Sequence, residues 1–189
     1  MDVFFQIWGG TGYFLAKAFL VRAEFVDDGR KARLAGWVAY LLGLPAWVFL
    51  FAGKQDWIAA AMEIAGVPAM ILGVVMTWQY KNNPHKIIDF GIKLFTGLMI
   101  IIGVSYSVHV FNGIKTFSQI LEIVSIIGYL AGTNLLAKRN PFAWLLYMIA
   151  HSSMSLLMYI QGKPILCVQQ IIAVILVIAG LIRAWKKAR

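Results

Sequence analysis

The segment WVAY at residues 37–40 returns as WLLY at residues 144–147, with the tryptophan and the tyrosine at the same spacing. The same offset of 107 residues relates two further pairs, Gly73 with Gly180 and Trp78 with Trp185. Both segments fall in apolar surroundings, which indicates a duplicated unit of three membrane helices. Such duplication is typical of small transporters, whose substrate site lies between the repeats near the middle of the bilayer.

The composition indicates an integral membrane protein. Of the 189 residues, 61% are hydrophobic and 13% are charged, and the mean hydropathy is +0.78. A soluble domain of this size could not cover so much apolar surface with so few charges. Apolar stretches of roughly 20 residues, long enough to cross a bilayer core of about 30 Å, recur along the chain. We predict transmembrane helices over residues 3–22, 33–52, 57–78, 87–110, 117–137, 143–160 and 164–184.

The predicted fold is an all-α membrane domain with seven transmembrane helices in a 3+1+3 arrangement. Residues 1–82 form the first repeat, residues 83–115 hold a single helix with its turns, and residues 116–189 form the second repeat. The single helix is required because three crossings leave the first repeat on the inner side, whereas the second repeat must begin on the outer side. The two repeats are therefore expected to be parallel, with a pseudo-twofold axis along the membrane normal.

Positive charge is distributed unevenly between the predicted loops. The formal net charge is +9, which in a soluble protein would suggest a nucleic-acid partner. Here twelve Lys and Arg residues fall on the side of the first, third and fifth loops and the C-terminal tail, against Lys54, Lys115 and Lys163 on the other side. The positive-inside rule then predicts an outer N-terminus, a cytoplasmic C-terminus and no nucleic-acid partner. Lys17 and Lys93 are interpreted as snorkelling from inner helix ends.

The best candidate for a binding site lies in the stretch 143–160. Trp144, Tyr147, His151 and Ser155 occur at i, i+3, i+7 and i+11, which places them on one helical face. An aromatic pair beside hydrogen-bonding groups suits a flat polar ring, since stacking supplies affinity and the polar groups fix orientation. Helix packing around a satisfied histidine explains the pattern equally well. Through the repeat, the predicted substrate site also includes Trp37 and Tyr40.

Further polar residues fall inside predicted helices, where each requires an explanation because polar groups are costly in hydrocarbon. Glu63 and Gln170 are repeat equivalents, and we assign both to the lining of a cavity, with interhelical hydrogen bonding as the alternative. Glu122, the equivalent of Gln6, lies nearer the outer surface, where contact with solvent is the alternative to substrate binding. Asn134 lies near an inner helix end and is assigned to an inner vestibule.

Catalytic and cofactor motifs are missing from the sequence. It has no P-loop, no HExxH, no Gly-x-Ser-x-Gly and no paired metal-ligand motif, so we predict no cofactor and no metal. Cys167 is the only cysteine, which excludes an internal disulfide and a Cys pair for a metal. A membrane enzyme that used Glu63 and His151 would lack a nucleophile or second acid at catalytic spacing.

The segments LAKR (136–139), WLLY (144–147) and YIQG (159–162), and the stretch 180–185, resemble the bacterial PnuC-type vitamin transporters. These nicotinamide riboside transporters are similar in layout to a doubled SWEET-like three-helix unit. The resemblance implies the 3+1+3 fold, the bacterial cytoplasmic membrane, a central pocket of aromatic and amide side chains, and facilitated uptake with intracellular phosphorylation trapping the substrate.

This chain departs from the family pattern in the predicted pocket. The helix that typically reads Trp-x-x-Trp-x-x-x-Asn in the family has Trp144, Tyr147 and His151 here. The repeat equivalent of His151 is Leu44, and Glu63 stands where family members often carry Gln. These departures concern the identity of the substrate rather than the transporter assignment.

We therefore predict a facilitator for a small vitamin or nucleoside with an aromatic ring, such as nicotinamide riboside. The two three-helix bundles would rock about the single helix, and Glu63 and His151 leave proton coupling open. A homo-oligomer is compatible with this prediction, because SWEET-like units often assemble. The alternative is a non-transporting scaffold or receptor-like subunit, in which the polar residues bury against each other without a cavity.

Overall fold

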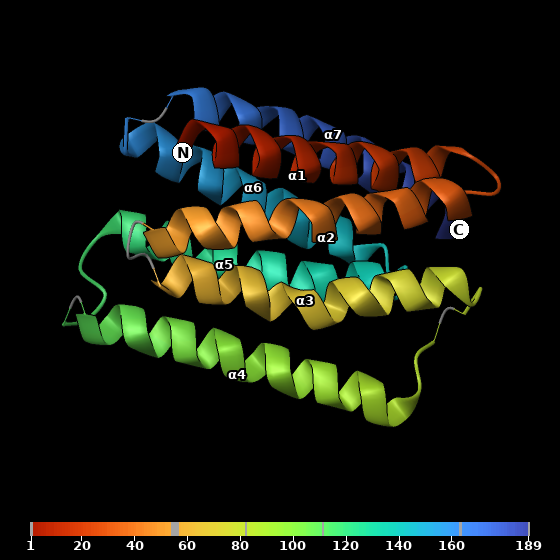
Figure 1. Ribbon diagram of the computed structural model, residues 1–189, viewed down its shortest axis with the longest axis horizontal. Helices are drawn as coiled ribbons and strands as arrows, with labels where there is room; N and C mark the ends of the chain where they lie inside the picture. The colour runs from red at the N-terminus through yellow and green to blue at the C-terminus, as the bar shows by residue number, and fades with distance from the viewer. Residues whose placement is uncertain (1, 54–56, 82, 111, 163, 189) are drawn as a thin grey trace.

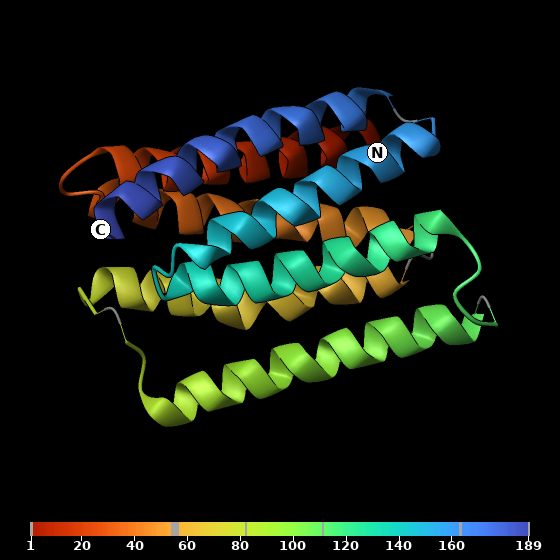
Figure 2. The same cartoon turned by 180° about the vertical axis from the view of Figure 1, so that it is seen from behind.

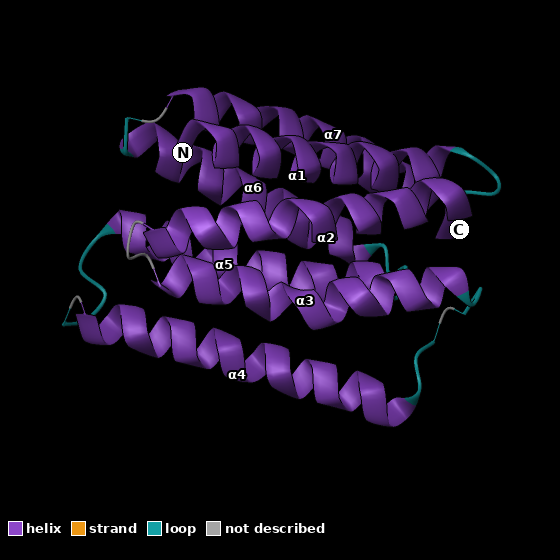
Figure 3. Ribbon diagram, in the orientation of Figure 1, coloured by secondary structure: helices purple, strands orange, loops and turns teal. Residues whose placement is uncertain are grey.

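The computed structural model describes residues 2–53, 57–81, 83–110, 112–162 and 164–188, and within these ranges the chain forms seven α-helices (Figure 3). They are α1 (Asp2–Phe25), α2 (Arg30–Gly53), α3 (Trp57–Trp78), α4 (Lys86–Val110), α5 (Phe117–Ala137), α6 (Phe142–Ile160) and α7 (Pro164–Ala188). These bounds agree with the predicted stretches to within a few residues. The agreement follows from the length and apolarity of each stretch, because a helix satisfies its own backbone groups where water cannot.

Six of the described helices, α2 to α7, are long and apolar enough to cross a membrane. The helix α1 has a comparable length but is less apolar, and it is not among the six. Its sequence explains the difference, since it includes Gln6, the run Gly9–Gly12 and Lys17. The structure is thus an all-α protein with the multiple apolar helices of a multi-pass membrane protein.

Six helices form a closed ring in the order α1, α2, α3, α5, α6, α7, in which each helix packs against the next and α7 returns to α1. The remaining described helix, α4, packs against α3 and α5 only and lies outside the ring (Figures 1 and 2). Successive helices run in alternating directions, so α1 and α5 run the same way (Figure 1). The first half, α1 to α3, and the second half, α5 to α7, therefore meet along two seams, α3 with α5 and α7 with α1.

One end of the bundle carries the turns α1–α2, α3–α4 and α5–α6 together with the end of α7 (Figure 1). We call it the tail end. It corresponds to the side of the chain on which the sequence concentrates its basic residues. Lys54, Lys163 and Arg189, which belong to the charge count, lie outside the described residues.

Tryptophan packs against glycine at equivalent places in the two halves. A Cβ atom added to Gly73 would lie 2.3 Å from the ring of Trp37, and one added to Gly180 would lie 2.9 Å from the ring of Trp144. Both indoles are almost fully buried. Because Gly73 on α3 and Gly180 on α7 have no side chain, each indole ring can lie directly against the backbone of that helix.

The crossing of the first two helices of each half is similarly close. A Cβ atom on Gly12 would lie 2.7 Å from the Cα atom of Gly43, and one on Gly128 would lie 2.8 Å from the Cβ atom of Ala150. Gly12 and Gly128 are repeat equivalents, as are Gly43 and Ala150. Small residues allow this approach, and close packing is what holds helices together in lipid.

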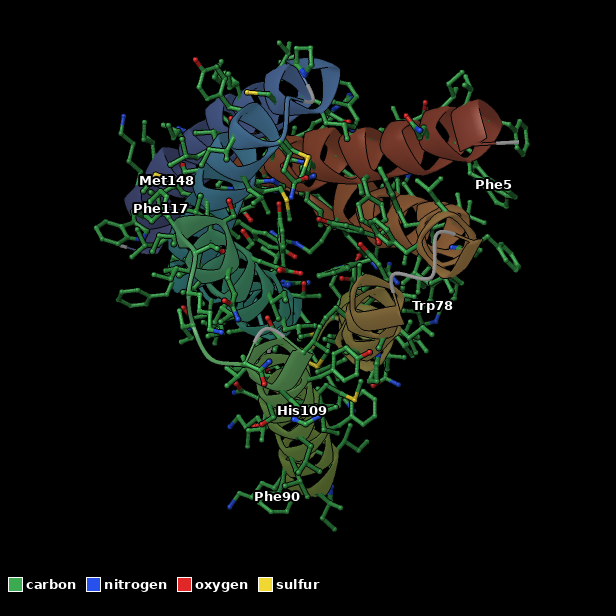
Figure 4. All side chains as sticks on the ribbon, turned by 90° about the vertical axis from the view of Figure 1, so that its left-hand side faces the viewer. Phe5, Trp78, Phe90, His109, Phe117 and Met148 are labelled. Atoms are coloured by element: carbon green, nitrogen blue, oxygen red, sulfur yellow. The ribbon has the colours of Figure 1, made fainter. Side chains whose placement is uncertain are left out.

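The outer surface of the bundle is apolar. Viewed along the helices, Phe90 on α4 and Phe117 on α5 point away from the ring (Figure 4). Much of α4 is exposed in the same way, including Ile87, Ile101 and Ile102. Polar side chains from both halves instead gather inside the ring, where the candidate site lies.

Candidate functional site

The first half contributes a hydrogen bond across the interior of the ring. Tyr13 on α1 donates its hydroxyl hydrogen to the carboxylate of Glu63 on α3. The ring of Tyr13 also lies edge-on to that of Tyr40 on α2, with centroids 4.8 Å apart. The first half thus orients an acidic side chain inside the ring and fixes it with an aromatic hydroxyl.

The second half holds a cluster of three side chains from its three helices. The hydroxyl of Tyr129 on α5 lies 2.8 Å from His151 Nδ1 on α6 and 3.2 Å from Gln170 Oε1 on α7. His151 Nδ1 and Gln170 Oε1 are 2.6 Å apart. The ring of Tyr147 stacks on His151 at 6.0 Å, and its hydroxyl lies 2.7 Å from Thr133 Oγ1.

The arrangement around His151 leaves one nitrogen of its ring without a partner. An amide oxygen can only accept a hydrogen bond, so the contact with Gln170 Oε1 requires the proton on Nδ1. His151 Nε2 is then a hydrogen-bond acceptor, and it is buried with no partner among the described residues. Such a group is costly unless something donates to it. A donor on a bound molecule would meet that need.

The two halves meet at a small cavity near Lys17. Its volume is about 10 Å³, and it is lined by Lys17, Leu20, Tyr40, Leu136, Trp144, Tyr147 and Val177. The ammonium of Lys17 lies 5.8 Å from the centre of the Tyr13 ring, and it interacts electrostatically with both Glu63 and His151. The interpretation of Lys17 as a snorkelling residue is therefore wrong, because its side chain lies at the centre of the ring.

The size of this cavity limits what it can hold. A volume of this order takes about one water molecule, whereas small-molecule sites usually measure roughly 300–1,000 Å³. Tyr40 and Tyr147, which are repeat equivalents, both line it, so each half contributes one tyrosine to its wall. A ring-sized ligand could bind here only after the two halves had moved apart.

Most of the predicted site residues converge on this region. Glu63, Tyr40, Trp144, Tyr147, His151 and Gln170 lie in the two clusters or line the cavity. Trp37 lies against Gly73, with its indole nitrogen buried and unpartnered among the described residues. Both tryptophans of the predicted site are thus packed on glycine, and of the two only Trp144 lines the cavity.

Three polar residues lie away from the centre. Ser155 lies on an open groove of about 420 Å³ between α6 and α7, 3.5 Å from Cys167 Sγ, and it is not among the residues that line the central cavity. Eleven residues of helix place it about 16 Å along the axis from Trp144. Glu122 is half-buried about 10 Å before Tyr129 along α5.

Asn134 is buried five residues after Tyr129, toward the tail end. Its Nδ2 atom has no hydrogen-bond partner among the described residues. The predicted inner vestibule therefore corresponds to a buried amide rather than to an open chamber around this side chain.

Sequence reasoning did not assign Lys17, Tyr13 or Thr133 to the site. The sequence does contain a signal, because Lys17 follows Tyr13 by four residues and so shares its helical face. An ionisable residue that is well inside an apolar helix and on the face of a buried tyrosine is a candidate for the interior.

Chemically, the centre offers donors and acceptors but no recognisable metal site. Lys17 and the tyrosine hydroxyls can donate, whereas Glu63 and His151 Nε2 can accept. Among the described residues no three His, Cys, Asp or Glu side chains are grouped to hold a metal ion. No family model, no curated protein and no solved structure matches this chain.

Proposed function

We propose that the protein is a membrane transporter for a small molecule with an aromatic ring, a vitamin or nucleoside such as nicotinamide riboside. The observation that carries the proposal is the charged and polar centre at Lys17, to which both halves contribute inside a ring of apolar helices. Ionisable residues are expensive within a membrane, and there they commonly mark the path of a substrate or an ion.

The proposed arrangement in the membrane is 3+1+3. The helices α1 to α3 and α5 to α7 would be two parallel repeats, and α4 would be the crossing that inverts the chain between them. The recurrence of the tryptophan–glycine contacts supports this arrangement. With the tail end on the cytoplasmic side of a bacterial inner membrane, the N-terminus would lie outside.

Transport would proceed by alternating access. Rocking of the halves about the α3–α5 and α7–α1 seams would widen the central cavity on one side and then on the other. Tyr40, Trp144 and Tyr147 would stack on the ring of the substrate, while Lys17, Glu63 and His151 Nε2 would bind its polar groups. The cycle is facilitative by default, and uptake that falls when the proton gradient is collapsed would instead indicate proton coupling.

Binding to the purified protein in detergent tests the proposal. The probes are nicotinamide riboside, thiamine, riboflavin, nucleosides and simple sugars, and the readout is the thermal unfolding temperature. We expect one ring compound to stabilise the protein, and Gln170→Ala or Trp144→Ala to remove the effect. Ser155→Ala is the control, because Ser155 lies on α6 but outside the central cluster. Uptake of the same compound into proteoliposomes would then establish transport.

A scaffold or receptor-like subunit is the second candidate, and the small cavity favours it. In that case the central residues serve packing alone. Trp144→Ala and Gln170→Ala would then lower the unfolding temperature, and no compound of the panel would raise it. Selective loss of ligand stabilisation in these variants would exclude the scaffold.

A further inference from the structure

A buried ion pair joins α1 and α2 at the tail end. Arg33 Nη2, in the first turn of α2, donates to Glu24 Oε1 near the end of α1 at 2.8 Å. The two side chains are only 9% and 10% exposed. A buried charge pair is stable only when its remaining hydrogen-bonding groups are also satisfied.

That condition is not met by the described residues. Arg33 Nη1 is buried without a hydrogen-bond partner, and so is the Nε atom of Arg139 in the α5–α6 turn. Burial, and after it the charge of Arg33, lower the pKa of Arg139 below its usual value, while Glu24 acts in the opposite direction. Arg139 thus interacts electrostatically with both members of the Glu24–Arg33 pair, so two guanidinium groups share the neighbourhood of one carboxylate.

The neighbouring lysine brings no acceptor to this cluster. Lys138 is paired with Asp89 of α4, a carboxylate that Lys93 also contacts, so the surplus of positive charge at this end remains. The cluster of Glu24, Arg33 and Arg139 keeps one uncompensated positive charge and two donor nitrogen atoms without acceptors among the described residues. An oxyanion supplies both of the missing features, since its oxygens accept from two guanidinium groups at once.

We infer that Arg33 and Arg139 form an anion site at the tail end, and that its ligand carries a phosphate group. The side chain of Arg139 is only partly buried, so a rotation of this side chain opens the site to the end of the bundle. The φ angle of Arg139 is 56°, a left-handed conformation that fixes the turn from which its side chain starts. The inference does not depend on the central cluster or on transport.

A phosphate group could come from solution or from a lipid headgroup, and two arms of one experiment separate these sources. In the first, thermal unfolding of the detergent-solubilised protein is followed against inorganic phosphate, with chloride at matched ionic strength as reference. In the second, native mass spectrometry compares retention of phosphatidylglycerol with that of phosphatidylcholine. Stabilisation by phosphate indicates a soluble ligand, and selective retention of phosphatidylglycerol alone indicates a lipid.

The matched variants are Arg139→Asn and Lys31→Gln. Asparagine tolerates the left-handed turn, and Lys31 is an exposed cation two residues from Arg33. Loss of one charge-assisted contact should weaken the apparent affinity of Arg139→Asn about tenfold or more, with little change in Lys31→Gln. The double variant Glu24→Gln/Arg33→Gln removes one of the two guanidinium groups together with the carboxylate that pairs with it, and it should also weaken phosphate binding. The inference is overturned if neither arm responds in the wild type, or if Arg139→Asn responds as the wild type does.

Discussion

The two halves of the ring place different chemistry at equivalent positions. In each half a tyrosine of the first helix, Tyr13 or Tyr129, donates to a side chain of the third helix. The acceptor is a carboxylate in the first half and an amide in the second. The position four residues after the tyrosine is Lys17 in the first half and Thr133 in the second.

One scaffold thus supports two different interiors. The first half holds an acidic and a basic side chain, Glu63 and Lys17, whereas the second half joins neutral side chains by hydrogen bonds and leaves His151 Nε2 without a partner among the described residues. The second half adds His151 where the first half has Leu44. The acidic and basic pair, Glu63 and Lys17, thus lies on one side of the centre only. The site is therefore asymmetric, although the two halves repeat the same three-helix unit.

The largest effect is expected from Lys17→Met. Lys17 interacts electrostatically with Glu63. Without the ammonium group, an ionised Glu63 would be an uncompensated charge inside the ring, which should lower the free energy of unfolding by about 3 kcal/mol. The equivalent change, Thr133→Val, removes one neutral hydrogen bond and should cost about 1 kcal/mol. Unfolding in mixed micelles measures both.

The double variant Lys17→Met/Glu63→Gln checks the cause of this loss. Because it also removes the carboxylate, it should recover most of the free energy of unfolding that Lys17→Met loses. If Lys17→Met proved no less stable than the wild type, Glu63 would have to be uncharged in the folded protein. That result would contradict the proposed difference in charge between the two halves.

A smaller effect is expected where tryptophan packs on glycine. Gly73→Ala and Gly180→Ala each force a methyl group against an indole, and overpacking of this kind typically costs about 1–3 kcal/mol. The contact is closer at Gly73, at 2.3 Å against 2.9 Å, so Gly73→Ala should be the more destabilised variant. Thermal unfolding in the same detergent compares them. Equal stability of the two variants would show that the first half relaxes more easily than its packing suggests.

The smallest effect is expected at Tyr129, and it is best measured against the equivalent change at Tyr13. Tyr13→Phe removes a hydrogen bond to a charged acceptor, which is worth about 1.5–3 kcal/mol, and Tyr129→Phe removes contacts with neutral groups, worth about 0.5–1.5 kcal/mol. The free energies of unfolding of both variants, measured side by side, give the difference directly. A larger loss in Tyr129→Phe would contradict the assignment of charge to the first half.

The sequence predicts the helices well because their signal is local. The bounds of α3 and α5, for example, coincide with the predicted stretches 57–78 and 117–137. The offsets of 107 and 116 residues also identify the positions that carry equivalent contacts, such as Trp37 with Trp144. An internal repeat identifies which residues of the two halves correspond, and because both halves pack in the same way, corresponding residues make equivalent contacts.

The interior was only partly predictable, because helix rotation and side-chain direction depend on neighbours that are distant in the sequence. Ser155 shares a helical face with Trp144 by spacing, yet its hydroxyl lies beside Cys167 on the groove between α6 and α7 rather than on the central cavity. Lys17 has the length to reach a helix end, and only the positions of Tyr13 and Glu63 show that it lies inside. The Glu24–Arg33 pair likewise depends on how the α1–α2 turn brings two helices together.

The seam between α1 and α7 has a consequence for how the protein is made. Because the backbone of α1 packs against only α2 and α7 among the described helices, one side of it stays uncovered until α7 has been synthesised. The least apolar of the seven described helices thus depends for its burial on the helix of the ring that is made last. Contacts within each half can form during translation, but ring closure must follow it, so assembly ends with the step of greatest sequence separation.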